Sequence, residues 1–403
     1  MSSVTPPRKK LLVLASTYPR WVGDPEPGFV HELARRLVDR FDVTVLCPHA
    51  PGAAAKESMD GVDVVRYRYA PQAWQTLVND GGIVTNLRRK KWKCLLVPGF
   101  VLAQAWCAWR LIRRCRIDVV HAHWLVPQGL IVALLQWLPG GKVPFLVTSH
   151  GADLYALRGR LLDRIKAFVA CRAEAVTVVS NAMRERVASL GVPASKVKVE
   201  PMGVDLTERF VPDPAVPRSQ RKILFVGRLV EKKGLRHLLD AMPLVLRHFP
   251  DASLDIAGFG PEEKALKAQV RALGLEAHAR FLGAMPQPQL PDLYRSAALF
   301  VAPFITAGSG DQEGLGLVLV EAAGCGCPLV VGNVPAVKDV LEHELIDPVD
   351  PRDAGQLASA IVATLSHPQR KCAEADALRA RLIGQFDWRQ VAGRYASLLA
   401  ECT

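Results

Sequence analysis

Residues 311–331, DQEGLGLVLVEAAGCGCPLVV, carry the clearest indication of the architecture, because the pattern of a glycine-rich turn is followed directly by those of an apolar helix and a short apolar strand. The section LGLVLVEAAGC is too apolar to lie on a water-exposed helix face, so we expect other elements to cover that helix. The strand PLVVG is continuously apolar, which is typical of a parallel sheet covered on both faces. The stretch therefore predicts one buried unit of an α/β domain.

The same alternation of short apolar runs and longer helical patterns continues along the chain and forms two series. The first series is KLLVLAS, DVTVLC, DVVHAH, PFLVTSH and AVTVVS, and the second is KILFVG, SLDIAG, ARFLGA, ALFVAP and PLVVG. Two such series predict two doubly wound domains. Because ligands of these sheets bind beyond the carboxyl ends of the strands, we expect functional residues directly after strands and a ligand in an interdomain cleft.

The linker between the two domains is expected at residues 209–222, RFVPDPAVPRSQRK, where three prolines and several charges interrupt the apolar pattern. This position predicts an N-terminal domain over residues 1–210 and a C-terminal domain over residues 211–385. The closing segment FDWRQVAGRYASLLA has the periodicity of an amphipathic helix. We expect this helix, at residues 386–403, to pack back toward the N-terminal domain.

The composition of the 403 residues indicates an intracellular globular protein with an anionic partner. The formal net charge of +12 suits a nucleotide phosphate, an acidic lipid or nucleic acid, and composition does not choose among them. The nine cysteines form no Cys-x-x-Cys pair, which favours a reducing compartment over a disulfide framework. The N-terminal apolar run is shorter than a signal-peptide core, so we interpret it as the first strand.

Two glutamates, Glu313 and Glu321, flank the start of the helix in the opening stretch. The first free N–H groups of that helix, those of Leu317 and Val318, favour an anion such as a phosphate. Carboxylates would repel the phosphate itself, so they are expected to accept hydrogen bonds from hydroxyls on either side of it. Eight residues of helix rise roughly 12 Å, which is long enough to reach from a sugar to a ribose across a diphosphate.

A second motif, KILFVGRLVEKKG at residues 222–234, places Gly227, Arg228 and Lys233 after a strand. Two cations at a strand end suit a diphosphate, and a glycine lets the backbone approach it. A solvated basic turn is the alternative interpretation. The motif SLDIAGFGPEE has only part of a dinucleotide fingerprint, so a plain strand-to-helix turn is favoured there over an NAD site.

Histidines follow two strands of the first series: His150 in LVTSHGADL, and His121 and His123 in VVHAHWLVPQG. His150 could hydrogen-bond a sugar hydroxyl, and a structural histidine is the alternative. No third partner makes a metal site convincing, and the absence of any Asp-x-Asp leaves a metal clamp on a diphosphate without its usual carboxylates. Near the N-terminus, Gly23 and Gly28 precede an amphipathic helix whose start could meet the diphosphate.

The chain resembles the retaining glycosyltransferases of family 4, which have the GT-B architecture of two Rossmann-like domains. The resemblance covers nearly the whole chain, and its motifs are specific in their order and spacing. They are STYP…GFVHELARRL, DVVHAHW, TSHGADL, VVSNAMRERV, VEPMGVD, FVGRLVEKKG, EGLGLVLVEAAGCGCPLVV and the closing helix.

The resemblance implies a role for each matching residue. Glu313 would hold donor-sugar hydroxyls, Glu321 the nucleotide ribose, and Arg228 and Lys233 the diphosphate, while His150 would lie beside the donor sugar. The expected catalytic set is His150, Glu313, Arg228 and Lys233. The expected donor-binding set is Gly23, Gly28, Gly227, Met285 facing the base, Gly314, Leu315, Gly316, Leu317, Val318 and Glu321.

Three stretches depart from the usual pattern of the family. The passage at residues 332–353, which would form the rim of the donor pocket, is shorter and lacks a second glycine cluster. Met202 replaces an Asn found in many members, and residues 306–312 form a longer approach to Glu313 than in the shortest members. None of these departures removes a residue assigned to the diphosphate.

The resemblance predicts a hexosyltransferase or related enzyme that moves a sugar from a UDP- or GDP-sugar to an acceptor hydroxyl, with retention, no metal and no cofactor. The acceptor would be lipid-linked or a polysaccharide of bacterial surface glycan biosynthesis. A non-catalytic nucleotide-sugar-binding protein of the same fold is the alternative. A nicotinamide-dependent oxidoreductase is disfavoured by the incomplete fingerprint at residues 258–263.

Residues 86–116 enclose about 16 apolar residues between basic clusters, fewer than the roughly 20 that span a membrane. The segment is therefore a candidate for lying on an anionic membrane, and an ordinary buried helix with solvated basic ends is the alternative. No nucleic-acid-binding module is recognisable. We expect a cytoplasmic protein, with peripheral attachment at the inner face of the cell membrane as the further hypothesis.

Overall fold

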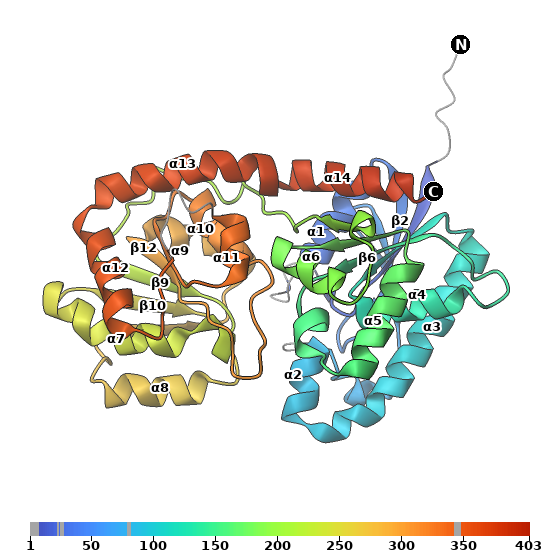
Figure 1. Ribbon diagram of the computed structural model, residues 1–403, viewed down its shortest axis with the longest axis horizontal. Helices are drawn as coiled ribbons and strands as arrows, with labels where there is room; N and C mark the ends of the chain where they lie inside the picture. Colours follow the sequence, from blue (N-terminus) through green and yellow to red (C-terminus); the bar gives the residue numbers. More distant parts are fainter. Residues whose placement is uncertain (1–7, 22–23, 25–27, 79–81, 342–347) are drawn as a thin grey trace, which may run out of the picture. The chain divides into compact units, whose positions relative to one another are not determined.

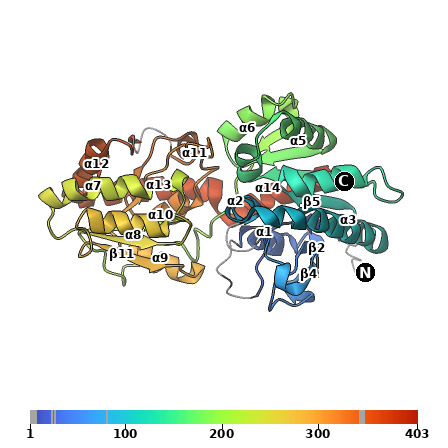
Figure 2. The same ribbon diagram turned by 90° about the horizontal axis from the view of Figure 1, so that it is seen from below.

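The computed structural model describes residues 8–21, 24, 28–78, 82–341 and 348–403. The chain divides into two compact units. The first comprises Met1–Met202 together with Val391–Thr403, and the second comprises Gly203–Gln390. Both units contain a sheet with helices packed against it (Figures 1 and 2).

The sheet of the first unit has eight strands in the order β3-β4-β2-β1-β5-β6-β7-β8. Neighbouring strands are parallel except for β3 and β4. Because β2 and β4 extend the sheet on one side of β1 and β5 to β8 on the other, the order reverses between β1 and β5. The bounds are β1 Lys9–Leu14, β2 Phe41–Pro48, β3 Lys56–Met59, β4 Val62–Tyr67, β5 Val119–His123, β6 Phe145–Ser149, β7 Ala175–Val178 and β8 Val197–Val199.

The hairpin β3–β4 was not expected from the sequence. Met59 pairs with Val62, so Asp60 and Gly61 form a two-residue turn, and both have positive φ, at 50° and 80°. An Asp-Gly pair with two positive φ angles forms the turn whose twist matches an antiparallel hairpin. The dipeptide was the available signal. The segments on both sides follow the strand–helix alternation of a parallel sheet, so an antiparallel pair of strands at the sheet edge was not expected.

The helices of the first unit place their apolar residues on one face. In α1 (Phe29–Leu37) the buried residues include Val30, Leu33, Ala34 and Leu37, a spacing that lines one side of a helix, and α1 contacts β2. The other helices are α2 Gly82–Arg89, α3 Leu96–Cys115, α4 Leu130–Leu135, α5 Arg160–Arg172, α6 Asn181–Ala188 and the part of α14 (Trp388–Glu401) that belongs to this unit.

Helix α3 packs on the sheet by one face only. It contacts β1, β2, β4 and α4, and Figure 1 shows α3, α4 and α5 side by side. Among the described residues, Lys91–Cys115 is the one helical segment that is long and apolar enough, by length and composition, to cross a membrane; 28% of its most apolar window is buried. From about 16 apolar residues in this region, the sequence predicts a segment too short to span a membrane. The buried residues recur every fourth position: Leu96, Phe100, Gln104, Ala108 and Ile112.

The sheet of the second unit has five strands in the order β11-β10-β9-β12-β13, all parallel. The strands are β9 Lys222–Val226, β10 Ser253–Ala257, β11 Ala279–Gly283, β12 Leu299–Ala302 and β13 Leu329–Val331, as the second series of apolar runs predicted. The order reverses between β9 and β12. The carboxyl ends of these two strands therefore mark the position where a doubly wound sheet binds its ligand.

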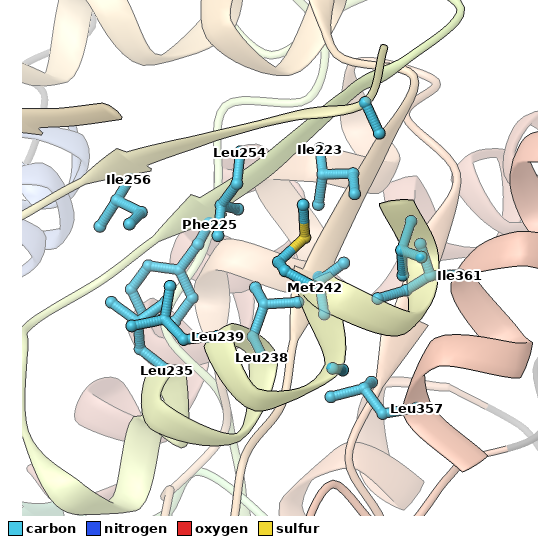
Figure 3. Close-up of a cluster of buried hydrophobic side chains, with 14 of the residues drawn as sticks. Ile223, Phe225, Leu235, Leu238, Leu239, Met242, Leu254, Ile256, Leu357 and Ile361 are labelled. Atoms are coloured by element: carbon cyan, nitrogen blue, oxygen red, sulfur yellow. The ribbon is translucent and has the colours of Figure 1, made fainter. Parts of the chain in front are cut away.

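The core of the second unit lies between the sheet and helices α7 (Leu235–His248), α8 (Glu263–Ala272) and α12 (Ala354–Ser366). Figure 3 shows Phe225 and Ile256 of the sheet facing Leu235, Leu238 and Leu239 of α7. Fully burying such a side chain contributes about 1.5–3 kcal/mol. The remaining helices of this unit are α9 Leu290–Ser296, α10 Leu317–Gly324, α11 Pro335–Val340 and α13 Pro368–Phe386.

Three histidines lie at the carboxyl edge of the first sheet: His121 and His123 in β5, and His150 directly after β6. His121 Nε2 is 2.7 Å from Thr148 Oγ1, and His123 Nδ1 is 2.9 Å from His150 Nε2. Burial disfavours the imidazolium form, so it lowers the pKa of His121 and of His150 to about 3 and that of His123 well below its ordinary value. The three rings are therefore neutral at physiological pH.

The neutral histidines should make the first unit sensitive to acid. Their pKa values are lower in the folded than in the unfolded state, so their contribution is complete above pH 6.5 and is lost as the pH falls toward 3. We expect a loss of about 1 kcal/mol per histidine per pH unit below 6.5. Tryptophan fluorescence during urea unfolding reports mainly this unit, because seven of the eight tryptophans lie in it, all but Trp388. His121→Asn should reduce the slope by about a third, and an equal slope in this variant would contradict the argument.

Gly234, which precedes α7, is required by a close backbone approach. Its φ is +68°, and a Cβ atom would lie 1.7 Å from the carbonyl oxygen of Pro303. Gly274 is a matched control, because its φ is +66° and a Cβ atom there would have nothing within 4 Å. We expect Gly274→Ala to cost about 1 kcal/mol of the free energy of unfolding, and Gly234→Ala about 3 kcal/mol or more, measured by calorimetry. Equal losses of unfolding free energy in the two variants would show that the backbone near Gly234 moves to accommodate the added Cβ atom.

Candidate active site

Apart from Met285, the predicted residues of the second unit lie in the segments and the helix that follow β9 and β12, where the strand order reverses. Gly227 and Arg228 directly follow β9, and Lys233 ends a short 3-10 turn, Glu231–Lys233, before α7. Glu313 lies in the segment between β12 and α10. The reversal of the strand order thus brings two motifs, about 80 residues apart in the chain, to one edge of the sheet.

An ion pair joins these two motifs. Lys233 Nζ is 2.8 Å from Glu313 Oε2, and the two side chains are only 12% and 15% exposed. Lys233 Nζ also lies over the ring of Phe304, 4.4 Å from its centroid. Burial by itself raises the pKa of Glu313, but the close ammonium group of Lys233, the charge of Lys232 and the Gly314 N–H outweigh it and hold this pKa at about 2. Glu313 is therefore ionised and acts only as an acceptor.

The segment before Glu313 is tied to the turn that contains Lys233. Glu231 Oε1 accepts a hydrogen bond from the Gly308 N–H at 2.7 Å, and Lys232 Nζ lies 3.3 Å from Asp311 Oδ1. Residues 306–312, the longer approach noted in the sequence, are therefore held by Glu231 and Lys232, the two residues that precede Lys233. These contacts are the physical reason that the longer segment still delivers Glu313 to the cation.

The sharp turn before α10 depends on Gly316. Its φ is +81°, and a Cβ atom would lie 2.9 Å from Phe304 Cε2. Gly314 and Leu315 are buried in this turn. The helix then begins at Leu317, so the N–H groups of Leu317 and Val318 have no carbonyl four residues earlier in the helix and point out of its N-terminus. These donors can hydrogen-bond an anion.

Glu321 lies one turn further into α10 and is 9% exposed. Its Oε2 accepts a hydrogen bond from the hydroxyl of Tyr294 at 2.9 Å. Burial raises the pKa of Glu321 to about 7, and the Tyr294 hydrogen bond and the charges of Lys233 and Arg209 partly offset this effect. The two glutamates of the motif therefore lie in opposite electrostatic environments.

Gly258 and Gly260, the glycines of the incomplete fingerprint, support the backbone that carries Arg228. A Cβ atom at Gly258 would lie 1.9 Å from Gly227 O, and one at Gly260 would lie 2.4 Å from Leu229 O. Both glycines are thus explained by the close approach of two loops. This geometry agrees with the interpretation of a plain strand-to-helix turn.

Met285, the predicted contact of the base, is half-buried in the segment that follows β11. Two residues further on, the Gln287 side-chain oxygen accepts a hydrogen bond from Arg209 Nη1 at 3.2 Å. Arg209 is one of the charges that lower the pKa of Glu321. Arg209 therefore both contacts the segment after β11 and lowers the pKa of Glu321.

In the first unit, His150 lies in an aromatic cluster. Its ring centroid is 4.8 Å from that of Phe29 and 5.1 Å from that of Trp124. Phe29 is the first residue of α1 and Gly28 is its N-cap, so the structure brings the predicted Gly28 segment and His150 together. Gly23, the other predicted glycine, lies outside the described residues.

The sequence reasoning missed several residues of these two sites. Asp153 is buried and accepts hydrogen bonds from the Leu125 N–H at 2.7 Å and from Ser149 Oγ at 2.8 Å, so it joins the segments that follow β5 and β6. Its position three residues after His150 in an apolar segment was the available signal. Phe304 and Tyr294 carried no signal, because aromatic residues near strands are usual in any core.

No metal-binding arrangement is evident in the described part of the chain, where no group of three or more His, Cys, Asp and Glu residues could hold an ion. Lys233 is paired with Glu313, and Arg228 follows Gly227 at the same strand end.

Comparisons with known proteins agree with this geometry. The model of Glycosyltransferase Family 4 matches residues 29–208, and that of Glycosyl transferases group 1 matches residues 207–379. The GDP-mannose-dependent alpha-(1-6)-phosphatidylinositol monomannoside mannosyltransferase of Mycolicibacterium smegmatis is 35% identical over 302 residues, which are 72% of this chain and 78% of that protein.

Two further similarities extend over almost the full length. A glycogen synthase of Mycobacterium tuberculosis is 28% identical over 410 residues, covering 95% of this chain and 92% of that one. The solved structure of sucrose-phosphate synthase from Thermosynechococcus elongatus has a TM-score of 0.78 at 21% identity, covering 98% and 99% of the two chains. The predicted resemblance and fold class are confirmed: the chain belongs to glycosyltransferase family 4 and is a nucleotide-sugar glycosyltransferase with the GT-B fold.

Proposed function

We propose that this enzyme transfers a sugar, with retention of the anomeric configuration and without a metal ion, from a nucleoside diphosphate sugar to an acceptor hydroxyl. The observation that carries the proposal is the buried ion pair of Lys233 and Glu313 beside the N-terminus of α10. It places one fixed cation and one acceptor-only group side by side. A sugar diphosphate offers the matching pair of an anion and adjacent hydroxyls.

In this proposal the diphosphate binds to Lys233, to Arg228 and to the N–H groups of Leu317 and Val318, and Glu313 accepts hydrogen bonds from hydroxyls of the donor sugar. The bond between the anomeric carbon and the diphosphate oxygen breaks, and the acceptor oxygen bonds to the same face of that carbon. The acceptor proton passes to the departing diphosphate. Preformed cations stabilise the charge that develops on the leaving group.

His150 would contact the donor sugar as a neutral hydrogen-bonding group. Its low pKa, caused first by burial and then by His121, excludes a role as a cationic acid near neutral pH. The hydrogen bond between His150 Nε2 and His123 Nδ1 fixes the orientation of the His150 ring, and with it the direction in which the other ring nitrogen, Nδ1, points. Gly28 at the start of α1 would provide backbone close to the same ligand.

The donor that the comparisons favour is GDP-mannose, because the 35% identical relative is named as GDP-mannose-dependent. UDP-sugars are the second candidate. Thermal stabilisation by a panel of UDP- and GDP-sugars distinguishes them, since a ligand that binds only the folded state raises its stability. The relative's name also specifies a phosphatidylinositol mannoside acceptor, which supports a lipid-linked acceptor and a role in surface glycan biosynthesis.

An anionic membrane surface is the proposed partner of the uncovered face of α3. Large apolar side chains are exposed on this segment: Trp92 is 47%, Leu95 78%, Leu102 69% and Trp106 57% exposed. The basic residues around them are exposed too, at Arg89, Lys90 and Lys91 before α3 and at Arg110, Arg113, Arg114 and Arg116 near its end. Apolar residues bordered by cations suit an interfacial helix at anionic lipids.

A helix that lies on the membrane fits α3 better than one that spans it. The face with Phe100, Gln104 and Ala108 is buried against the sheet of the first unit, and a spanning helix would have to leave that sheet. The membrane surface therefore meets only the opposite face. We propose on this basis a cytoplasmic location with peripheral attachment at the inner face of the membrane.

The proposed chemistry predicts that removing either member of the buried pair abolishes most transfer. Lys233→Ala, Arg228→Ala and Glu313→Gln should each lower kcat by about 10²–10³, because each removes a group that stabilises the transition state. Lys267→Ala is the control, since its ion pair with Glu263 is exposed on α8. Product stereochemistry by NMR tests retention. Near-normal turnover in all three variants would refute the proposed site, whereas donor binding without any turnover by the unaltered enzyme would favour the non-catalytic alternative.

The membrane proposal predicts that the exposed face of α3 controls binding to lipid vesicles. A variant with Leu102→Ala and Trp106→Ala should lose most flotation with vesicles of phosphatidylglycerol and phosphatidylcholine, and added salt should weaken binding of the unaltered protein. Trp74→Ala is the matched control, because Trp74 is also exposed, at 56%, but lies outside α3. Equal flotation of the two variants would exclude α3 as the membrane contact.

A further inference from the structure

Tyr294 makes a contact that the proposed chemistry does not use. It lies in α9, is fully buried, and its hydroxyl donates to Glu321 Oε2 at 2.9 Å. Glu321 belongs to α10, which packs against α9. The hydrogen bond therefore connects the glutamate expected at the ribose to a helix that carries no other predicted site residue.

The ring of Tyr294 is held in one orientation. It makes an edge contact with Phe300 of β12, at 5.4 Å between ring centroids and an interplanar angle of 81°, and a tilted contact with Phe210 at 6.2 Å. Arg218 Nη1 donates to the carbonyl oxygen of Tyr294 at 3.3 Å. Because both the ring and the backbone are packed, the hydroxyl is a fixed donor.

A fixed donor on one carboxylate oxygen decides what the other oxygen can do. An ionised carboxylate accepts through both oxygens, and a vicinal diol donates two hydrogen bonds. With Oε2 bonded to Tyr294, rotation of the carboxylate is restricted, and the direction of Oε1 is restricted with it. Such preorganisation reduces the ordering cost of binding.

The charge state of Glu321 depends on its surroundings from several elements. Lys233 and Arg209 act on it as cations, and the hydroxyl of Tyr294 stabilises its ionised form against burial. Cys325 directly follows α10, and burial raises the pKa of its thiol to about 12, so it is uncharged at neutral pH. From α13, Arg379 Nε donates to the carbonyl oxygen of Gly324 at 2.9 Å.

We propose that Tyr294 is a positioning residue for the nucleotide ribose: its hydroxyl orients Glu321 so that the carboxylate accepts hydrogen bonds from the ribose diol. This inference rests on the proposed function, in which Glu321 binds the ribose. Removing the hydroxyl leaves the carboxylate buried without its donor, so the site should hold the ribose less well and require a higher pH to ionise.

The test compares the affinities of GDP and 2′-deoxy-GDP by titration calorimetry from pH 6 to 8.5, with UDP and 2′-deoxy-UDP used if the unaltered enzyme prefers uridine. The unaltered enzyme should bind the ribonucleotide about 10- to 100-fold more tightly, the range of hydrogen bonds to a charged group. Tyr294→Phe should reduce this ratio at least threefold and move the pH at which affinity is half-lost upward. Glu321→Gln should reduce the ratio with little remaining pH dependence.

Tyr395→Phe is the control, because Tyr395 is also fully buried and donates from its hydroxyl to a backbone carbonyl, that of Glu200 at 2.9 Å in the first unit. It should keep the ratio and the pH profile. A folded Tyr294→Phe variant with both unchanged overturns the inference while leaving the proposed function intact. A lack of discrimination already in the unaltered enzyme would instead refute the placement of the ribose at Glu321.

If Tyr294→Phe does not fold, 3-fluorotyrosine at position 294 keeps the ring and strengthens the donated hydrogen bond. The ribose-to-deoxyribose ratio should then rise and the pH midpoint should fall. Unchanged values for both would overturn the inference as well.

Discussion

The ion pair between Lys233 and Glu313 is the interaction on which the site of the second unit depends. Lys233 ends the turn after β9 and Glu313 lies in the segment after β12, and these are the two strands between which the sheet reverses its order. Joining these residues at 2.8 Å fixes both segments at the carboxyl edge of the sheet. Glu231 and Lys232 reinforce this arrangement from the same turn, so three consecutive residues after one strand control the position of a residue 80 positions later.

The two glutamates of the motif show that surroundings alone can give the same side chain two very different pKa values. Glu313 is next to an ammonium group, and its pKa is held at about 2. Glu321 is buried in α10 with a tyrosine hydroxyl as its nearest donor, and its pKa is raised to about 7. A permanently ionised acceptor suits sugar hydroxyls beside a phosphate-binding cation. Burial favours the protonated form of a carboxyl group such as that of Glu321, so a fixed hydrogen-bond donor is needed to keep it ionised.

Much of the fold could be predicted because its signals are local. All five strands of the second unit were expected, since each is a short apolar run between helical patterns. The hairpin of β3 and β4 was missed, although Asp60 and Gly61 carry a turn signal, because its alternating strand resembles neither a buried strand nor a helix. Gly316 and Gly258 both have positive φ, at 81° and 143°, but only the fold shows that the carbonyl oxygen of Gly227 lies against Gly258.

By itself the sequence determined the order of strands and helices, the location of functional residues after strands and the identity of the charged groups, because periodicity and residue chemistry are properties of neighbouring positions. Only the tertiary structure decided which of these groups meet: Lys233 with Glu313, Tyr294 with Glu321, His123 with His150, and Asp153 with the Leu125 N–H. Each contact joins residues from different elements. Its existence depends on the strand order and on burial, and burial also sets the charge of the groups that meet.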